Sequence, residues 1–298
     1  MDKTFLYWAC FSYNYGRHRL FMVWGMMFNF SIFQAYKQLM KLFFFLLNLI
    51  PFTLCAQPFS LELEGTEALV ADKFWGVDTY NNVYFSENNV FYKIENEKTF
   101  QYQDLQLGDL ESVDILNPLK VLLFYKEANT VVLLDNRFNE VERINFNVIS
   151  DYKTVDFARI SKDNLLWIFN ADLQQLELFD YDKLTTQSTS LPLKQNVLGL
   201  KSNYNYAWVH HPLGFSIYTI NASVADTIDL DKAEFFAVYK NRLMVLADDY
   251  FELYTKGFNT KLMFEKPKIS FNQFYYNGEN IYIYANDLMY TYRIQTDK

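Results

Sequence analysis

The stretch VLLFYKEANTVVLLD, residues 121–135, decides the fold. Two apolar segments, Val121–Tyr125 and Val131–Asp135, flank a short polar turn, and this arrangement predicts a β-hairpin. Five further hairpins of the same kind occur along the chain: Val83–Ser86 with Val90–Ile94, Leu165–Phe169 with Leu176–Phe179, Ala207–His210 with Phe215–Ile220, Leu243–Ala247 with Phe251–Tyr254, and Ile281–Ala285 with Leu288–Ile294. Successive hairpins begin about 40 residues apart, a period that is typical of the blades of a β-propeller.

A propeller blade has four strands, so each hairpin needs a further strand on either side. The segments that precede the hairpins are expected to form the innermost strands: Ala71–Val77, Leu110–Val113, Lys153–Val155, Val197–Leu200, Phe235–Val238 and Ile269–Phe274. The segments that follow the first five hairpins are expected to form the outermost strands: Phe100–Leu105, Glu140–Phe146, Thr185–Leu193, Val224–Leu230 and Lys261–Phe264. The sixth hairpin has no such segment after it for an outermost strand. The alternating segment Phe59–Glu64, which no other blade uses, can supply this strand and close the ring in the last blade.

The predicted fold is therefore an all-β, six-bladed propeller with four antiparallel strands in each blade. Seven blades would need about 40 more residues, and five would leave one hairpin without a blade. Asparagine takes the place of the scarce glycine in several expected turns, because it tolerates the left-handed conformation that tight turns need.

Residues 40–56 have the pattern of a signal peptide. Lys41 follows Met40, the apolar run Leu42–Leu54 comes next, and Ala56 offers a small residue for cleavage. This run is short for a membrane span, which needs about 20 residues; a retained anchor is the alternative. Residues 1–39 are then interpreted as a misassigned upstream extension, with an N-terminal membrane hairpin as the rival interpretation. The propeller domain is expected over residues 57–298.

Removal of residues 1–56 would change both the charge and the thiol content of the protein. The whole chain carries a net charge of −8 and this segment carries +4, so the mature domain would carry −12. Both cysteines, Cys10 and Cys55, lie in the removed segment. An acidic domain without clustered Lys or Arg is not expected to bind nucleic acid. The sequence also lacks G-x-S-x-G, H-E-x-x-H, P-loop and G-x-G-x-x-G motifs, which leaves little material for a nucleophilic active site.

Two segments carry a family resemblance. Asp78–Phe85 and Ser161–Phe169 look like the "D-x-x-G-N" repeat unit of NHL- and YVTN-type propellers, with Asn where Gly is usual, and Leu133–Asp135 and Leu178–Asp180 look like the strand-ending Asp of that repeat. The resemblance covers about residues 58–294 and implies a propeller fold. The Asn-, Phe- and Tyr-rich composition, with Gln57 after the expected cleavage site, looks like that of an exported protein of a Gram-negative bacterium. It leaves the function open, because these families include enzymes, ligand binders and scaffolds.

One repeated position carries the candidate site. The residues there are Asp78, Asp114, Asp156, Lys201, Tyr239 and Tyr275, which in register would ring one mouth of the central channel. The three aspartates lie on adjacent blades and would offer oxygen ligands to Ca²⁺ or another divalent cation. The alternative is that each aspartate caps its own turn. No other cofactor is expected.

His210 and His211 form the second candidate metal site, because imidazole is a common metal ligand. They are expected in the turn of the fourth hairpin, where plain surface exposure is the alternative. Trp75, Trp167 and Trp208 lie in or beside strands. A tryptophan that faces the channel could stack on a sugar, whereas packing between blades is the commoner role.

The sequence favours a non-catalytic, exported propeller that binds a protein or a ligand in the cell envelope. The expected partner is an envelope protein or an extracellular ligand, and the mature domain is expected to be a monomer without a stable membrane span, in the periplasm or at the cell surface. The first alternative is a periplasmic hydrolase or lactonase-like enzyme with a cation in the channel. The second is a carbohydrate-binding module.

Overall fold

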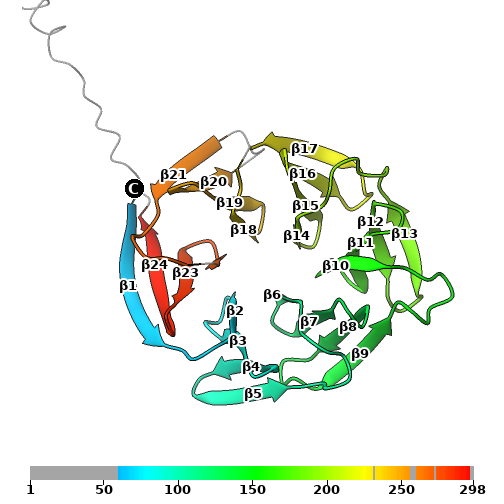
Figure 1. Cartoon of the computed structure of the whole chain (residues 1–298), viewed down its shortest axis with the longest axis horizontal. Helices are drawn as coiled ribbons and strands as arrows, with labels where there is room; N and C mark the ends of the chain where they lie inside the picture. The colour runs from blue at the N-terminus through cyan, green and yellow to red at the C-terminus, as the bar shows by residue number, and fades with distance from the viewer. Residues whose placement is uncertain (1–59, 231, 256–259, 272, 296–298) are drawn as a thin grey trace, which may run out of the picture. The chain divides into compact units, whose positions relative to one another are not determined.

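Six small sheets surround one axis in this protein (Figure 1). The computed structural model describes residues 60–230, 232–255, 260–271 and 273–295. These residues form six four-stranded antiparallel sheets and no helix, which confirms the predicted six-bladed propeller. The expected extension (residues 1–39) and signal peptide (residues 40–56) lie outside the described residues.

The first five blades follow one another along the chain, each as a simple antiparallel meander. Blade 1 contains β2 (Lys73–Val77), β3 (Val83–Glu87), β4 (Val90–Glu95) and β5 (Lys98–Tyr102), and blade 2 contains β6 (Ser112–Asn117), β7 (Lys120–Tyr125), β8 (Thr130–Leu134) and β9 (Glu140–Asn145). Blade 3 contains β10 (Val155–Ile160), β11 (Leu165–Asn170), β12 (Gln175–Asp180) and β13 (Thr185–Thr189). Blade 4 contains β14 (Gly199–Ser202), β15 (Tyr206–His211), β16 (Gly214–Thr219) and β17 (Val224–Asp229), and blade 5 contains β18 (Phe235–Tyr239), β19 (Arg242–Ala247), β20 (Tyr250–Thr255) and β21 (Thr260–Glu265).

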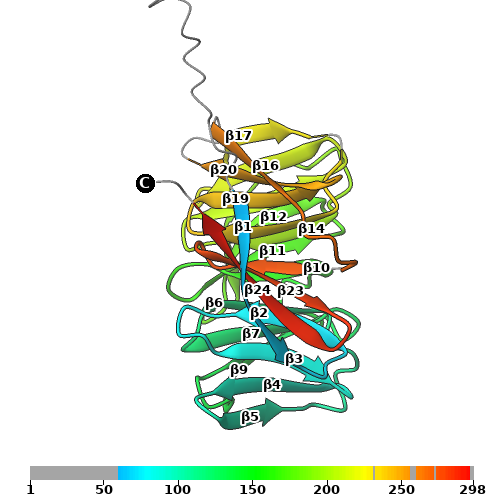
Figure 2. The same cartoon turned by 90° about the vertical axis from the view of Figure 1, so that its left-hand side faces the viewer.

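Blade 6 joins the two ends of the described chain. It is built from β22 (Phe274–Tyr276), β23 (Asn280–Ala285) and β24 (Leu288–Gln295), and β1 (Ser60–Ala68) is its outermost strand. β1 runs antiparallel to β24 along its whole length, with a bulge between Leu63 and Gly65 (Figure 2). The predicted closing strand is therefore confirmed, and it extends four residues beyond the predicted end at Glu64. This pairing covers the edge of β24 that an open ring would expose.

The innermost strands of several blades lie further along the chain than predicted. β6 begins at Ser112 rather than Leu110 and runs to Asn117, and β10 begins at Val155, where the predicted strand ended. In blade 6, β22 begins only at Phe274. The predicted bounds followed the apolar residues. The innermost strands face the channel on one side, so polar residues occur within them and interrupt the apolar pattern.

The core is divided among the spaces between neighbouring blades. Six apolar clusters occur in the described residues, and each combines side chains from two adjacent blades. Between blades 2 and 3, for example, Leu122 and Phe124 of β7 pack with Ile160 of β10 and Ile168 of β11. This explains why the middle strands are apolar at consecutive positions: both of their faces are covered by a neighbouring sheet.

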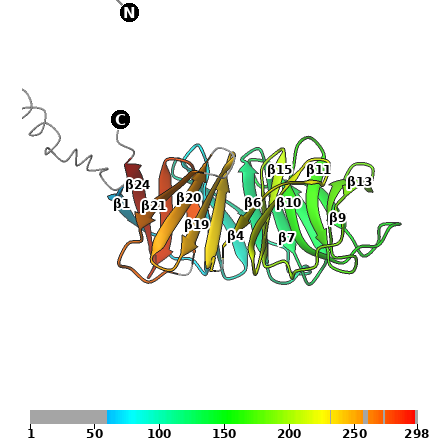
Figure 3. The ribbon, with the colours of Figure 1, turned by 90° about the horizontal axis from the view of Figure 1, so that it is seen from above.

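The tight turns use left-handed residues other than glycine. Asn81, Asn88 and Asn89 have positive φ angles of 64°, 50° and 59°, as predicted for asparagine in these turns. At two other turns the left-handed residue is the neighbour of the expected asparagine, Asp163 in one and Lys240 in the other. Seen from the side, the strands run between the two faces of the ring, so the turns gather on those faces (Figure 3). Across the described residues there is no helix suited to crossing a membrane.

Candidate functional site

The innermost strands enclose a cavity of about 390 Å³ on the propeller axis. All six blades contribute to its lining: Trp75, Val77, Asp78 and Thr79 from blade 1, Val113–Leu116 and Pro118 from blade 2, Arg159 from blade 3, Ser202–Asn205 and Lys201 from blade 4, Phe236–Asn241 from blade 5, and Gln273–Tyr275 and Asn277 from blade 6. Thr79, Pro118 and Asn205 belong to the connections between first and second strands. We call the face that carries these connections the entrance face. A cavity of this size falls at the lower end of the range for small-molecule sites, about 300–1,000 Å³.

Five of the six residues in the predicted ring line this cavity: Asp78, Asp114, Lys201, Tyr239 and Tyr275. Asp156 is not among the lining residues. Its carboxylate lies 2.8 Å from the ammonium of Lys126, and both side chains are partly exposed. Asp156 stands near the start of β10, because that strand begins at Val155 and not at Lys153 as the sequence suggested.

Arg159 occupies the position in blade 3 at which the sequence placed Asp156. Strand register shows the equivalence, because Arg159 pairs with the third residue of the next strand, Trp167. Asp114 pairs in the same way with Leu122, the third residue of β7. Lys201 pairs with the third residue of β15 and Tyr275 with the third residue of β23. The sequence reasoning missed Arg159; the signal that could have found it is a lone arginine between apolar residues in an innermost strand.

Asp78 is fully engaged by its own turn. One carboxylate oxygen accepts from the backbone amides of Tyr80 (2.8 Å) and Asn82 (3.0 Å), and the other accepts from the Asn82 side-chain amide (2.8 Å) and the Tyr84 hydroxyl (2.9 Å). Burial, followed by the charge of Asp78, raises the pKa of Tyr84, so this phenol stays protonated and keeps donating. Asp78 thus holds the first turn of blade 1.

Asp114 joins two blades. One of its oxygens accepts from the backbone amide of Leu116 at 2.9 Å, and the other accepts from the amide of Ile160 in blade 3 at 2.8 Å. The structure does not bring the three predicted aspartates together around one point. Among the residues that the structure describes, no group of three His, Cys, Asp or Glu side chains has an arrangement that could hold a metal ion.

His210 and His211 lie outside the axial cavity. β15 continues through His211, so both residues belong to a strand and not to a turn, which corrects the predicted placement. The His210 ring stacks on Phe215 at 4.8 Å and meets the edge of Phe236 at 5.4 Å, while His211 Nε2 lies 2.9 Å from Ser216 Oγ. Burial lowers the pKa of both imidazoles, so both are neutral at pH 7.

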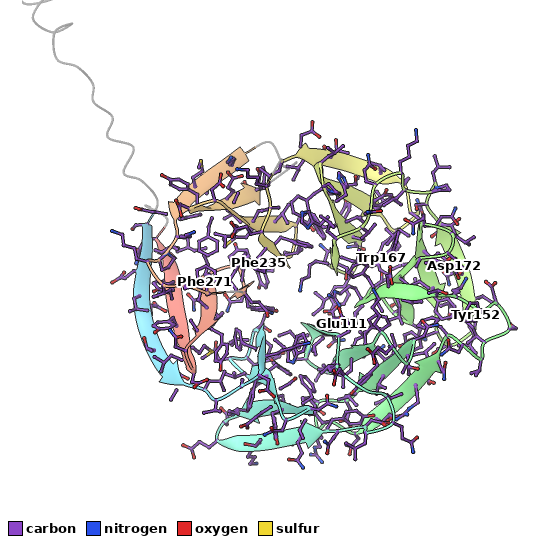
Figure 4. All side chains as sticks on the ribbon, in the orientation of Figure 1. Glu111, Tyr152, Trp167, Asp172, Phe235 and Phe271 are labelled. Atoms are coloured by element: carbon purple, nitrogen blue, oxygen red, sulfur yellow. The ribbon has the colours of Figure 1, made fainter. Side chains whose placement is uncertain are left out.

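Of the three tryptophans singled out in the sequence, two pack between blades and one lines the axial cavity. Trp167 and Trp208 are completely buried in the clusters on either side of blade 4 (Figure 4 labels Trp167). A sugar cannot reach either ring while the blades remain packed, which removes Trp208 as a carbohydrate platform. Trp75 is half-buried and lines the axial cavity, where its indole Nε1 donates to Ser86 Oγ.

Three cationic side chains line the cavity: Lys240 is exposed, whereas Arg159 is buried and Lys201 is half-buried. Arg159 is buried and donates from Nε to the carbonyl of Leu200 (2.8 Å) and from Nη1 to Ser112 Oγ (2.8 Å) and the carbonyl of Ala158 (2.9 Å). Within the described ranges it forms no ion pair with a carboxylate and its Nη2 donates to no protein acceptor. Arg159 is therefore held in place by neutral oxygens, and part of its guanidinium remains available to a ligand.

Lys201 has no bonding partner for its ammonium. Nζ makes neither a hydrogen bond nor an ion pair with any residue that the structure describes. Burial and, after it, the charge of Arg159 lower the pKa of Lys201 to about 8, while the charge of Asp114 opposes both. The residue is half-buried and lines the cavity.

Aromatic rings form the opposite wall of the cavity. The Tyr275 ring lies directly over Gly76 (φ 133°), where an added Cβ would stand 2.4 Å from the ring. The Tyr239 ring lies over Gly278 (φ 101°) in the same manner, at 2.3 Å. Glycine is required at both positions by the backbone angle and by the approach of the ring. Burial raises the pKa of Tyr275, so its hydroxyl is a neutral hydrogen-bond donor.

The fold and this cavity define a class: a six-bladed β-propeller with an axial pocket that combines three cations, aromatic rings and hydrogen-bonding groups. A scan against protein-family models finds no match, and a search of curated proteins finds none either.

Solved structures share the fold. The chain is similar to virginiamycin B lyase from Staphylococcus aureus at 11% identity and a TM-score of 0.55, with 79% of this chain and 100% of the lyase covered. It is also similar to the β-propeller domain of Cps50 (Swd1) from Myceliophteria thermophila at 7% identity and a TM-score of 0.56, with the same coverage. The WD40 domain of Neurospora crassa Pan2 matches at 11% identity and a TM-score of 0.52, with 76% of each chain covered. At these identities the similarity shows the propeller fold alone, and the NHL or YVTN type of repeat stays a prediction.

Proposed function

We propose that this protein is an exported, non-catalytic propeller that binds a small ligand in its axial cavity. The observation that carries the proposal is the cavity itself, about 390 Å³ in volume and lined by all six blades. Its walls combine apolar rings with a few polar groups that face inward, which is the usual construction of a small-molecule site.

The chemistry of the lining favours binding over catalysis. The two carboxylates in the lining, Asp78 and Asp114, use their oxygens as acceptors: Asp78 for donors within blade 1, and Asp114 for backbone amides of blades 2 and 3. A carboxylate that acts as a general acid or base must be free to exchange a proton with the substrate. Histidines commonly do such work, but here His210 packs against the rings of Phe215 and Phe236, and His211 lies within hydrogen-bond distance of Ser216 Oγ, outside the cavity.

The cellular location belongs to the same proposal. The signal-like segment at residues 40–56 supports export, and it would place the propeller in the periplasm or at the cell surface. Fractionation of the native organism with mass spectrometry of the N-terminus tests this part. A mature chain that begins near residue 57 in an envelope fraction supports export. A cytoplasmic chain that retains Trp24 contradicts it.

Ligand binding is tested by a thermal-shift screen of the purified full chain against neutral, cationic and anionic metabolites. Hits are then measured in Thr79→Trp and Asn205→Trp, two variants that place an indole at the exposed entrance of the cavity. The matched control is Thr185→Trp, an exposed position on the outermost strand of blade 3. The proposal expects hits whose stabilisation disappears in both entrance variants and persists in the control. The absence of any hit, or hits that survive both entrance variants, would refute the cavity as the binding site.

A further inference from the structure

Positive charge exceeds negative charge in the axial cavity, although the chain as a whole is acidic. The ionised groups that face it are Arg159, Lys201 and Lys240 against Asp78 and Asp114, whereas the chain has a net charge of −8. Lys240 lies at the exposed rim above the Tyr239 ring, and the two aspartates are satisfied by protein donors. The uncompensated charge is therefore concentrated on Lys201 and Arg159.

A buried ammonium without a partner is unfavourable, and proteins usually pair such a group. The two lysines that are buried among the described residues are paired: Lys93 contacts Glu95 at 2.6 Å, and Lys153 contacts Glu177 at 2.9 Å and Asp151 at 2.8 Å. The half-buried Lys201 departs from this pattern, and it lines a cavity that an external molecule can enter. An unpaired cation at this place indicates that its counterion is supplied from outside.

We propose that the axial cavity binds a compact organic oxyanion, a carboxylate or phosphate group attached to a planar apolar body. This inference rests on the proposed function and names the ligand class. Lys201 Nζ and the free Nη2 of Arg159 donate to the anionic oxygens. Charge-assisted hydrogen bonds of this type are about twice as strong as neutral ones, and guanidinium matches the geometry of carboxylate and phosphate.

The remaining walls define the body of the ligand. Tyr239, Tyr275, Phe236 and Trp75 present aromatic surface that suits a ring or a flat apolar group. The hydroxyls of Tyr239 and Tyr275 form no hydrogen bond with protein groups in the described ranges, so they can donate to a second polar group of the ligand. The cavity volume of about 390 Å³ limits the whole molecule to a small metabolite and excludes a polymer.

The test is isothermal titration of the full chain at pH 7 with matched pairs of acid and amide: benzoate with benzamide, and indole-3-acetate with indole-3-acetamide. Phenyl phosphate tests whether the anionic group is phosphate. The proposal expects the acid of at least one pair, or phenyl phosphate, to bind at least 10-fold more tightly than the neutral compound. Lys201→Met should remove this preference and Lys201→Arg should retain it. Lys98→Met, at an exposed position on the outermost strand of blade 1, should change affinity by less than about twofold.

Protonation provides a second measurement. Binding of the acid should weaken as the pH rises above about 8, because Lys201 then loses its charge, and the neutral amide should show no such change. Equal binding of acid and amide, or acid binding that survives Lys201→Met in a folded variant, would overturn the ligand class. A screen that yields only neutral cavity ligands would overturn it as well, while leaving the proposed function intact. A screen without any cavity ligand would overturn both.

Discussion

Replacement of Lys201 by methionine should stabilise the unliganded protein. Methionine has nearly the same length and volume as lysine but carries no charge, so it removes the unpaired ammonium without opening a large void. Most substitutions of buried residues destabilise a protein. A gain in stability at this position would show that the charge is retained for binding at the expense of the fold, as is common for functional sites.

The size of the gain follows from the pKa of Lys201. Its fall from 10.5 to about 8 corresponds to a penalty of about 3 kcal/mol on the protonated side chain, at about 1.36 kcal/mol for each pKa unit. Water in the cavity screens part of this penalty, so we expect a gain of about 1–3 kcal/mol in the free energy of unfolding. For a domain of this size each kcal/mol raises the thermal midpoint by about 2–4 °C.

The pH dependence of the gain has a definite sign. Below about pH 8 the amine is protonated in both the folded and the unfolded protein, so the penalty is complete and the gain from Lys201→Met is largest. Between about pH 8 and 10.5 the folded protein releases the proton while the unfolded chain keeps it. The stability of the wild type therefore rises towards that of the variant, and the difference between them shrinks.

Urea denaturation at pH 7 and pH 10 measures these differences, with Lys153→Met as the matched control. Lys153 is also buried, but its ammonium contacts Asp151 and Glu177, so its removal leaves a buried carboxylate unpaired. The control should lose about 3–5 kcal/mol. A Lys201→Met variant that loses stability at pH 7 as the control does would refute the reasoning, because Lys201 would then have a stabilising partner.

Three further changes test the fold and its titratable groups. The thermal midpoint should fall as the pH decreases from 7 to 5, because burial holds the pKa of His210 below its usual value and the unfolded chain takes up the proton first. The midpoint of His210→Phe should fall less over the same range, and an equal fall would contradict the role of His210. Gly76→Ala should lower the free energy of unfolding in urea by about 1–3 kcal/mol, because φ is 133° and the new methyl group meets Tyr275. Gly65→Ala, where an added Cβ has nothing within 4 Å, should change it by less than about 1 kcal/mol. Equal effects of the two substitutions would refute the steric argument. Deletion of residues 1–68 removes β1 and exposes the edge of β24, so it should lower the thermal midpoint and produce aggregates on size-exclusion chromatography. A monomer with an unchanged thermal midpoint would contradict closure of the ring by β1.

The blades were predictable from sequence because their signal is local. The second and third strands of a blade are neighbours along the chain, so a pattern such as residues 121–135 contains both strands and the turn that sets their register. The closing strand was also predictable, because six complete hairpins left one alternating segment without a partner. The middle strands are apolar on both faces, and this was also predictable, because in a ring of blades each face of a sheet packs against a neighbouring sheet.

The innermost strands were less predictable because polar residues interrupt their apolar pattern where they face the cavity. Asp156 and Arg159 lie three residues apart in the same segment, and only the pairing of Arg159 with Trp167 shows which of them reaches the axis. The connections between blades differ in length, so the sequence cannot align one blade with the next at the level of a single residue.

Hairpin periodicity in the sequence was sufficient for the number of blades and for the closure of the ring, since these depend on contacts within one blade. The sign of the charge on the axis depended on the tertiary structure. Three aspartates and one lysine were expected at the channel mouth, whereas the register of β10 places Arg159 beside the segment that carries Lys201, and Asp156 forms the outer salt bridge with Lys126. Contacts between blades join residues about 40 positions apart, and the alignment of such contacts is established only when the blades pack.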